Sequence, residues 1–260
     1  MIEARRQQIM EEIKKQKFTK VSDLAIVFDV SQVTIRKYLQ ELETEGAIVR
    51  YHGKIALAES PAISYNVRSK QNNHKKVAIA KVAADMIRNA RTVALDAGTT
   101  TTLIAQEIAK MDKLSIVTNS LMVANTLEHS TSSINIVGGQ MVGQSMCTVG
   151  PDAEEYLGRI KTELAFVGCT GVRGTQGLCT GLRLEGSIKQ AIMRTGERVV
   201  AVFDDSKFQT ASMYVFSDFS NIDTIITTRP EVRPEAMDRI EELGIQVIYA
   251  DEVLEQNEEK

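Results

Sequence analysis

A short run of polar residues after a predicted strand offers the clearest chemistry in this chain. Residues 93–104 read VALDAGTTTTLI, in which an apolar run ends at Asp96, Gly98 follows, and four threonines begin a helical pattern. This order predicts a strand, a tight turn and a helix start. The first turn of a helix has free N–H groups and a positive dipole end, so it stabilises a phosphate or carboxylate. An ordinary connection with a threonine as the helix cap fits the same pattern.

Polar or glycine residues also follow four other predicted strands. These ends read Asn119-Ser120, Gly138-Gly139, Gly168-Cys-Thr-Gly171 and Asp204-Asp-Ser-Lys207. In an open parallel sheet, ligands bind outside the carboxyl ends of the strands, so we expect all five ends to meet at one edge. Glycine, Asn and Asp are common in turns for conformational reasons alone. Five such ends at one edge nevertheless favour a binding site.

The residue types indicate an anionic ligand that carries hydroxyl groups. The turn at Gly98 suits a phosphate, and Lys207 offers a compensating cation. Asp96, Asn119 and either Asp204 or Asp205 offer hydrogen bonds suited to sugar hydroxyls. Two of the candidates have an ordinary structural explanation as well. Glu185 could simply be a favourable negative charge in the first turn of a helix, and Lys207 could be a solvent-exposed lysine in a turn. The candidate ligand-binding residues are Asp96, Gly98, Thr99, Thr100, Thr101, Asn119, Ser120, Gly138, Gly139, Glu185, Asp205 and Lys207.

The elements that position these ends alternate between strand and helix. Strands are predicted at residues 92–95, 115–118, 134–137, 164–167, 199–203, 224–227 and 246–249. Helices are predicted at residues 77–87, 121–127, 153–157, 184–193 and 234–243. Such alternation predicts an α/β domain with a mostly parallel sheet and helices on both faces.

The first 57 residues follow a different pattern, that of a winged helix-turn-helix domain. The first helix is predicted over residues 2–16, the second begins at Thr19, and the third has Ser31 as its N-cap. Two strands are predicted at residues 48–51 and 55–57. In the third helix the apolar stripe turns basic and hydrogen-bonding residues outward, as a DNA-reading helix requires. The candidate DNA-binding residues are Ser31, Gln32, Val33, Thr34, Arg36, Lys37, Arg50, His52 and Lys54.

A small helical domain with a solvated charged face is the alternative for this region. Glu41, Glu43 and Glu45 crowd the end of the third helix, whereas Arg36 and Lys37 lie early in it. That polarity favours DNA, because the early residues of a reader helix face the base edges.

The composition of the chain restricts the kind of protein that it can be. The chain has 260 residues, 43% of them hydrophobic, and a formal net charge of -3, so any DNA contact is confined to one module. The apolar runs are too short to span a membrane, which predicts a cytoplasmic protein. The three cysteines fit neither a metal site nor a disulfide framework, and we expect no cofactor. Residues 1–57 are predicted to bind DNA, 58–74 to form an extended linker, and 75–260 to form the α/β domain.

Two sets of motifs resemble the DeoR family of bacterial transcription regulators. The first set comprises Arg5, Ile9, Ile13, Ser31, Thr34-Ile35-Arg36-Lys37, Leu39 and Tyr51-His52-Gly53. The second comprises the DAGTT turn, Thr118-Asn119-Ser120, Gly138-Gly139 and Asp205-Ser206-Lys207-Phe208. The resemblance implies a sensor domain similar to the ribose-5-phosphate isomerase, glucosamine-phosphate deaminase and CoA-transferase group of folds, with a phosphorylated sugar or related metabolite as ligand. Tyr38 and Lys54 depart from the family pattern, outside the outward reader positions.

We therefore expect a repressor of a sugar-utilisation operon that binds operator DNA as a homo-oligomer and responds to a phosphorylated sugar. A sugar-phosphate isomerase or deaminase with an appended helical domain is the main alternative, with Asp204, Asp205, Glu185 or Lys207 as acid or base. Against it, His52, His74 and His129 lie away from the predicted rim. A DNA-binding protein whose second domain only oligomerises is a third hypothesis.

Overall fold

The computed structural model describes residues 2–16, 19–44, 48–51, 54–57 and 65–253, with only the backbone described for 2–4, 44, 49–51, 54, 56 and 57. The chain divides into two compact units, residues 1–71 and 72–260. Each unit has its own buried hydrophobic clusters. No helix in the described ranges is long and apolar enough to cross a membrane.

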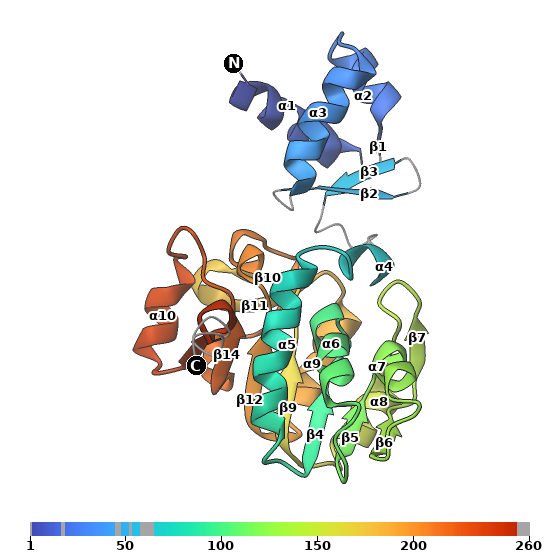
Figure 1. Cartoon of the computed structure of the whole chain (residues 1–260), viewed down its shortest axis with the longest axis vertical. Helices are drawn as coiled ribbons and strands as arrows, with labels where there is room; N and C mark the ends of the chain where they lie inside the picture. Colours follow the sequence, from blue (N-terminus) through green and yellow to red (C-terminus); the bar gives the residue numbers. More distant parts are fainter. Residues whose placement is uncertain (1, 17–18, 45–47, 52–53, 58–64, 254–260) are drawn as a thin grey trace. The chain divides into compact units, whose positions relative to one another are not determined.

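The described part of residues 1–57 contains three helices and a small antiparallel sheet (Figure 1). The helices are α1 (Ile2–Lys15), α2 (Val21–Val27) and α3 (Gln32–Thr44), and the sheet has the order β1 (Thr19–Lys20), β3 (Lys54–Leu57), β2 (Ile48–Tyr51). Ile9, Leu24, Ile35 and Leu39 are fully buried in its core. The predicted winged helix-turn-helix is confirmed.

One helix start in this unit was predicted too early. Thr19 belongs to β1, where it pairs with Ile55, and α2 begins at Val21. The β-branched Thr19 is buried, and Lys20 has an extended backbone. Pairing with β3 therefore takes precedence over the local helical pattern.

Part of the range predicted as an extended linker is helical. Residues 58–64 lie outside the described residues, but α4 (Tyr65–Arg68) follows them and α5 (Asn73–Ile87) starts four residues before the predicted helix. Tyr65 is buried, and Asn72 hydrogen-bonds to Asp204. Polar residues in this range form helices and bind partners in the folded chain. Their composition therefore led to an extended linker being predicted where part of the chain is helical.

The second unit is built on a seven-stranded sheet in which every neighbouring pair is parallel. Its order is β15 (Gln246–Tyr249), β14 (Thr224–Thr227), β12 (Gly196–Val202), β9 (Thr162–Val167), β4 (Thr92–Leu95), β5 (Ser115–Thr118), β6 (Ser133–Ile136). All seven predicted strands are confirmed, four with the predicted bounds. The chain runs outward from β4 to β6 and returns to β9 on the other side of β4, so the strand order reverses between β4 and β9.

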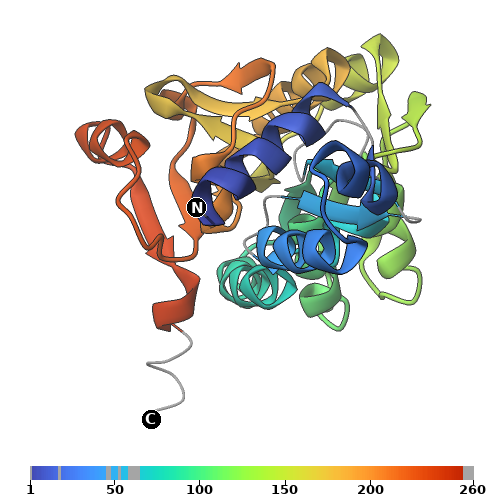
Figure 2. The ribbon, with the colours of Figure 1, turned by 90° about the horizontal axis from the view of Figure 1, so that it is seen from above.

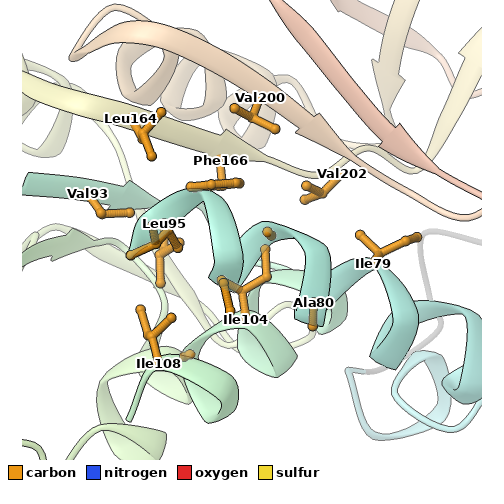
Figure 3. Close-up of a cluster of buried hydrophobic side chains, with 14 of the residues drawn as sticks. Ile79, Ala80, Val93, Leu95, Ile104, Ile108, Leu164, Phe166, Val200 and Val202 are labelled. Carbon is orange, nitrogen blue, oxygen red and sulfur yellow. The ribbon is translucent and has the colours of Figure 1, made fainter. Parts of the chain in front are cut away.

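Helices cover both faces of this sheet, as the alternation predicts. One face carries α5, α6 (Thr99–Ile108) and α7 (Leu121–Thr126), where Leu95, Phe166 and Ile104 are buried together (Figure 3). The other face carries α8 (Pro151–Leu157) and α9 (Arg183–Met193), and α10 (Ala236–Glu242) packs beside the β12–β14 part of the sheet.

Several short elements were not predicted. They are the hairpin β7 (Gln140–Val142) and β8 (Cys147–Val149), the three-stranded sheet β10 (Gly171–Arg173), β11 (Gly177–Thr180) and β13 (Tyr214–Ser217), and the 3-10 turns η1 (Gly174–Gln176), η2 (Asp205–Gln209) and η3 (Phe219–Asn221). The β7–β8 hairpin and α10 lie toward opposite ends of the seven-stranded sheet (Figure 2). β7, β8 and β10 have only three residues each, and β10 and β11 begin with glycine, so these strands carry too short or too weak a pattern to be detected from sequence.

Candidate functional site

Helix α3 presents its early residues to solvent. Ser31 caps the helix, because its Oγ accepts the N–H of Thr34 at 3.1 Å. Ile35 and Leu39 are fully buried, which places the intervening residues on the outside. The exposed positions are Ser31, Gln32, Val33, Thr34, Arg36 and Lys37, the whole predicted reader set on this helix. Val33 is 73% exposed, an apolar side chain at a position where a thymine methyl group is a suitable partner.

The predicted wing has the expected strands. β2 and β3 pair antiparallel, from Ile48 opposite Leu57 to Tyr51 opposite Lys54. His52 and the side chains of Arg50 and Lys54 lie outside the described residues. Tyr38, one of the two departures from the family pattern, packs partly buried against the core of this unit.

The five predicted strand ends of the second unit follow five adjacent strands. In sheet order these are β12, β9, β4, β5 and β6, all parallel, so their carboxyl ends lie at one edge. The reversal of strand order falls between β4 and β9. There Asp96 donates its N–H to the Phe166 carbonyl at 3.0 Å and accepts the Gly168 N–H on its Oδ2 at 3.2 Å.

Asp96 is buried in an ion pair that the sequence did not reveal. Its Oδ2 pairs with Nζ of Lys189 on α9, and both side chains are buried. Burial raises the pKa of Asp96 above its ordinary value, and the Lys189 ammonium offsets only part of this effect. The second oxygen, Oδ1, is buried and has no hydrogen-bond partner among the described residues. Asp96 therefore has one acceptor held in place and one unused.

The start of α6 lacks a capping side chain. Its N-cap is Gly98, whose φ of -174° is ordinary extended backbone. The threonine cap that the sequence allowed is therefore wrong. The hydroxyls of Thr101 and Thr102 instead donate back to the Gly98 carbonyl, at 3.0 and 2.8 Å. The first-turn N–H groups and the remaining hydroxyls of Thr99 and Thr100 can serve an anion.

Asn119 is the counterpart of Asp96 on the neighbouring strand. Both residues directly follow the register pair Leu95–Thr118 of β4 and β5. Asn119 is fully buried and donates its Nδ2 to the Thr148 carbonyl at 2.9 Å, while its Oδ1 finds no partner in the described part of the chain. Ser120 has a structural role, because its Oγ accepts the N–H of Val123 and caps α7.

The segment after β12 brings Lys207 to the same edge. Asp204 is buried, and burial opposes its ionisation, but Lys207 and the Ser206 hydroxyl hold its pKa below the ordinary value. Lys207 also acts electrostatically on Cys169, whose pKa is raised by burial, in the loop after β9. Lys207 follows β12, the neighbour of β9 in the sheet, so its backbone lies at the same edge as the loop after β9. Asp205 is bound to Lys75, with Nζ and Oδ1 2.6 Å apart.

Two other predicted site residues are explained by structure. Gly139 has φ of +133°, and a Cβ there would lie 2.6 Å from the Val149 carbonyl oxygen, whereas a Cβ on Gly138 would meet nothing within 4 Å. Glu185 is buried in the first turn of α9, where its carboxylate accepts the hydroxyls of Ser145 and Thr180. Neither feature by itself indicates a ligand.

The geometry defines a class of protein, a DNA-binding module joined to an α/β domain with a polar site at its sheet edge. Residues 5–61 match the DeoR-like helix-turn-helix domain, and residues 71–229 match the DeoR C terminal sensor domain. The chain belongs to the DeoR family of transcription regulators.

Relatives match over most of the chain. The glycerol-3-phosphate regulon repressor of Escherichia coli (strain K12) is 30% identical over 224 residues, covering 85% of this chain and 89% of that protein. The HTH-type transcriptional regulator GlpR of Haloferax volcanii is 30% identical over 246 residues, covering 94% of this chain and 96% of that protein. Among solved structures, ribose 5-phosphate isomerase A from Methanocaldococcus jannaschii gives a TM-score of 0.39 at 16% identity, covering 52% of this chain and 54% of that chain.

Proposed function

We propose that this regulator represses sugar-utilisation genes and that a phosphorylated sugar, bound at the sheet edge formed by the ends of β9, β4 and β5, lowers its affinity for the operator. The observation that carries the proposal is the pair of unused buried acceptors, Oδ1 of Asp96 and Oδ1 of Asn119, at the ends of adjacent strands. A buried acceptor without a donor costs free energy, which a ligand hydroxyl would recover.

The phosphate of the ligand would bind at the start of α6. The uncapped N–H groups after Gly98 and the hydroxyls of Thr99 and Thr100 supply donors, and Lys207 supplies a positive charge. The sugar hydroxyls would then donate to Asp96 and Asn119. One relative represses the regulon of glycerol 3-phosphate, a phosphorylated polyol, which agrees with a ligand of this chemistry.

The operator would be bound by α3, whose exposed residues include Gln32, Arg36 and Lys37. One reader helix covers only half of a symmetric operator, so the protein would act as a dimer or larger oligomer. Arg50, His52 and Lys54 would add phosphate contacts from the wing. A regulator of this kind acts where the chromosome lies, so we place it in the cytoplasm.

The ligand would act by preferring one arrangement of the two units. A ligand that binds the DNA-incompetent arrangement more tightly lowers operator affinity by the ratio of its two affinities. No chemical change of the ligand is needed, and we propose that the protein is not an enzyme.

One observation favours the enzyme alternative enough to require a test. A buried carboxylate with a raised pKa at a ligand site, such as Asp96, is also a common feature of a general base. Against it, Oδ2 of Asp96 is occupied by Lys189, and both oxygens of Glu185 accept hydroxyl groups.

The test is a panel of ribose 5-phosphate, fructose 6-phosphate, glucosamine 6-phosphate and glycerol 3-phosphate. Each compound is assayed for its effect on the melting temperature and for turnover by product analysis. We expect at least one to raise the melting temperature without being consumed, since a bound ligand stabilises the folded state. Turnover would support the enzyme. A panel that leaves the melting temperature unchanged would support a second domain that only oligomerises.

A further inference from the structure

The segment that carries Lys207 is fastened to the first residues of the second unit. The side-chain Nδ2 of Asn72 donates to Oδ1 of Asp204 at 2.9 Å and to Oγ of Ser206 at 3.2 Å. Lys75, one helical turn further along α5, forms its 2.6 Å ion pair with Asp205. Two side chains at the start of α5 thus hold three consecutive residues after β12.

This contact is partly shielded from solvent and is tied to the sheet. The side chains of Lys75 and Asp205 are only 32% and 12% exposed. Asp205 also accepts the hydroxyl of Thr228 at 2.5 Å, and its own N–H donates to the same Oγ1 at 3.1 Å. Because Thr228 directly follows β14, the segment 204–207 is held from the sheet on one side and from α5 on the other.

Asn72 has a conformation that frees its amide for this contact. It is the N-cap residue of α5 with φ of 47°, in the left-handed region, and its side chain does not cap the helix. Asparagine is among the few residues that adopt this backbone conformation at low cost. An ordinary capping side chain would bond to the helix's own N–H groups. Here the amide reaches across to Asp204 and Ser206.

Asn72 lies at the boundary between the two compact units of the chain. The first compact unit ends at Gln71, so Asn72 is the next residue along the chain. The segment that presents Lys207 at the sheet edge therefore contacts the residue where the connection from the DNA-binding unit enters the second unit. Hydrogen bonds join residues 204 and 206 directly to residue 72, with no intervening element.

We propose that Asn72 and Lys75 are positioning residues that couple the effector site to the connection with the DNA-binding unit. This inference rests on the proposed function. An anionic ligand at the start of α6 draws the Lys207 ammonium toward itself, and the segment 204–207 moves with it. Because Asn72 donates to Asp204 and Ser206, and Lys75 pairs with Asp205, this movement shifts the position of residue 72. By reciprocity, operator binding changes ligand affinity through the same contacts.

Three substitutions test this coupling. Asn72→Gly removes the amide and tolerates the left-handed backbone. Asn72→Asp keeps the shape and places a carboxylate beside Asp204. Lys75→Met removes the charge and keeps most of the side-chain length. Lys81→Met, at an exposed position of the same helix, is the matched control.

The measurement is operator affinity by fluorescence anisotropy at fixed salt, with and without whichever of the four named phosphates stabilises the parent most. Typical couplings change affinity by about 5–150-fold. In the Asn72 and Lys75 variants we expect this ratio to fall to within about twofold of one, while the ligand still raises the melting temperature. Lys81→Met should keep the parent ratio.

Two results would overturn the inference while leaving the proposed function intact. The first is a parental ratio in all three variants. The second is loss of the ratio together with loss of ligand binding, which would make these residues part of the binding site only. If the parent itself shows no change in operator affinity, the proposed function fails, and the coupling fails with it.

Discussion

Lys189 on α9 is the buried counter-ion of Asp96 at the end of β4, and the pair lies where the strand order of the sheet reverses. Each charge makes the burial of the other tolerable. A buried ion pair adds little net stability compared with an apolar pair of similar size, but removing one partner leaves an uncompensated charge.

The pair predicts a strongly non-additive double-mutant cycle. Lys189→Met leaves the Asp96 carboxylate buried without its cation, and the free energy of unfolding should fall by about 3–5 kcal/mol. Adding Asp96→Asn should restore a large part of this loss. Urea denaturation of the parent, both single variants and the double variant measures the coupling. Additive losses would show that the two side chains do not compensate each other.

The two glycines after β6 should respond differently to alanine. Gly139→Ala places a Cβ against the Val149 carbonyl at a positive φ, and we expect a loss of about 1–3 kcal/mol. Gly138→Ala meets open space and serves as the control. The melting temperatures of the two variants show whether the loss of stability is specific to Gly139→Ala. Equal values would remove the backbone explanation for Gly139.

Asp204 should make stability depend on pH in the acid range. Burial alone would raise its pKa, but Lys207, Ser206, Lys76 and Asn72 hold it below the ordinary 3.8. A lowered folded-state pKa gives stability that is complete above about pH 4 and is lost as the pH falls through the folded value.

Asp204→Asn should therefore be less stable than the parent at pH 7, and the difference should shrink below about pH 4. Urea unfolding at pH 7, 5, 4 and 3 provides the comparison. A difference that stays constant down to pH 3 would contradict the lowered pKa.

Arg36→Ala should weaken operator binding. Loss of a contact to a base edge costs about 1–3 kcal/mol, or roughly 5- to 150-fold in Kd, and loss of a phosphate contact lowers the salt dependence by about one counterion. Lys14→Ala removes one exposed positive charge from α1 and serves as the control. Anisotropy titrations at several salt concentrations separate the two kinds of contact. Equal affinities for Arg36→Ala and the parent would exclude Arg36 from the interface.

The sheet was predictable because its strands are short apolar runs between polar or glycine ends. β4, β5, β14 and β15 have the predicted bounds, and the parallel arrangement followed from strand–helix alternation. The outward face of α3 was equally predictable, because Ile35 and Leu39 fix its buried side. Both features depend only on local periodicity.

The partners of the site were not predictable in the same way. In the sequence, Lys189 is one polar residue on an amphipathic helix. Its pairing with Asp96 arises only when the chain folds. Asn72 and Lys75 lie in or beside a stretch whose polar composition is typical of a solvated linker. Ser120 and Gly139 have the right residue types for a ligand site, but the helix cap formed by the Ser120 hydroxyl and the positive φ of Gly139 account for them. Pairings between residues distant in sequence carry no local signal.

The variant Gly98→Asp shows whether a phosphorylated sugar at the start of α6 controls operator binding. Aspartate is a good N-cap, so α6 should persist, while the new carboxylate repels a phosphate from the site. Operator Kd is measured for the parent and the variant, with and without the sugar phosphate that most stabilises the parent. We expect the ligand to raise Kd at least about fivefold for the parent and not at all for Gly98→Asp, with equal operator affinities in the absence of ligand. A variant that responds like the parent, or a parent that does not respond to a stabilising sugar phosphate, would contradict this expectation.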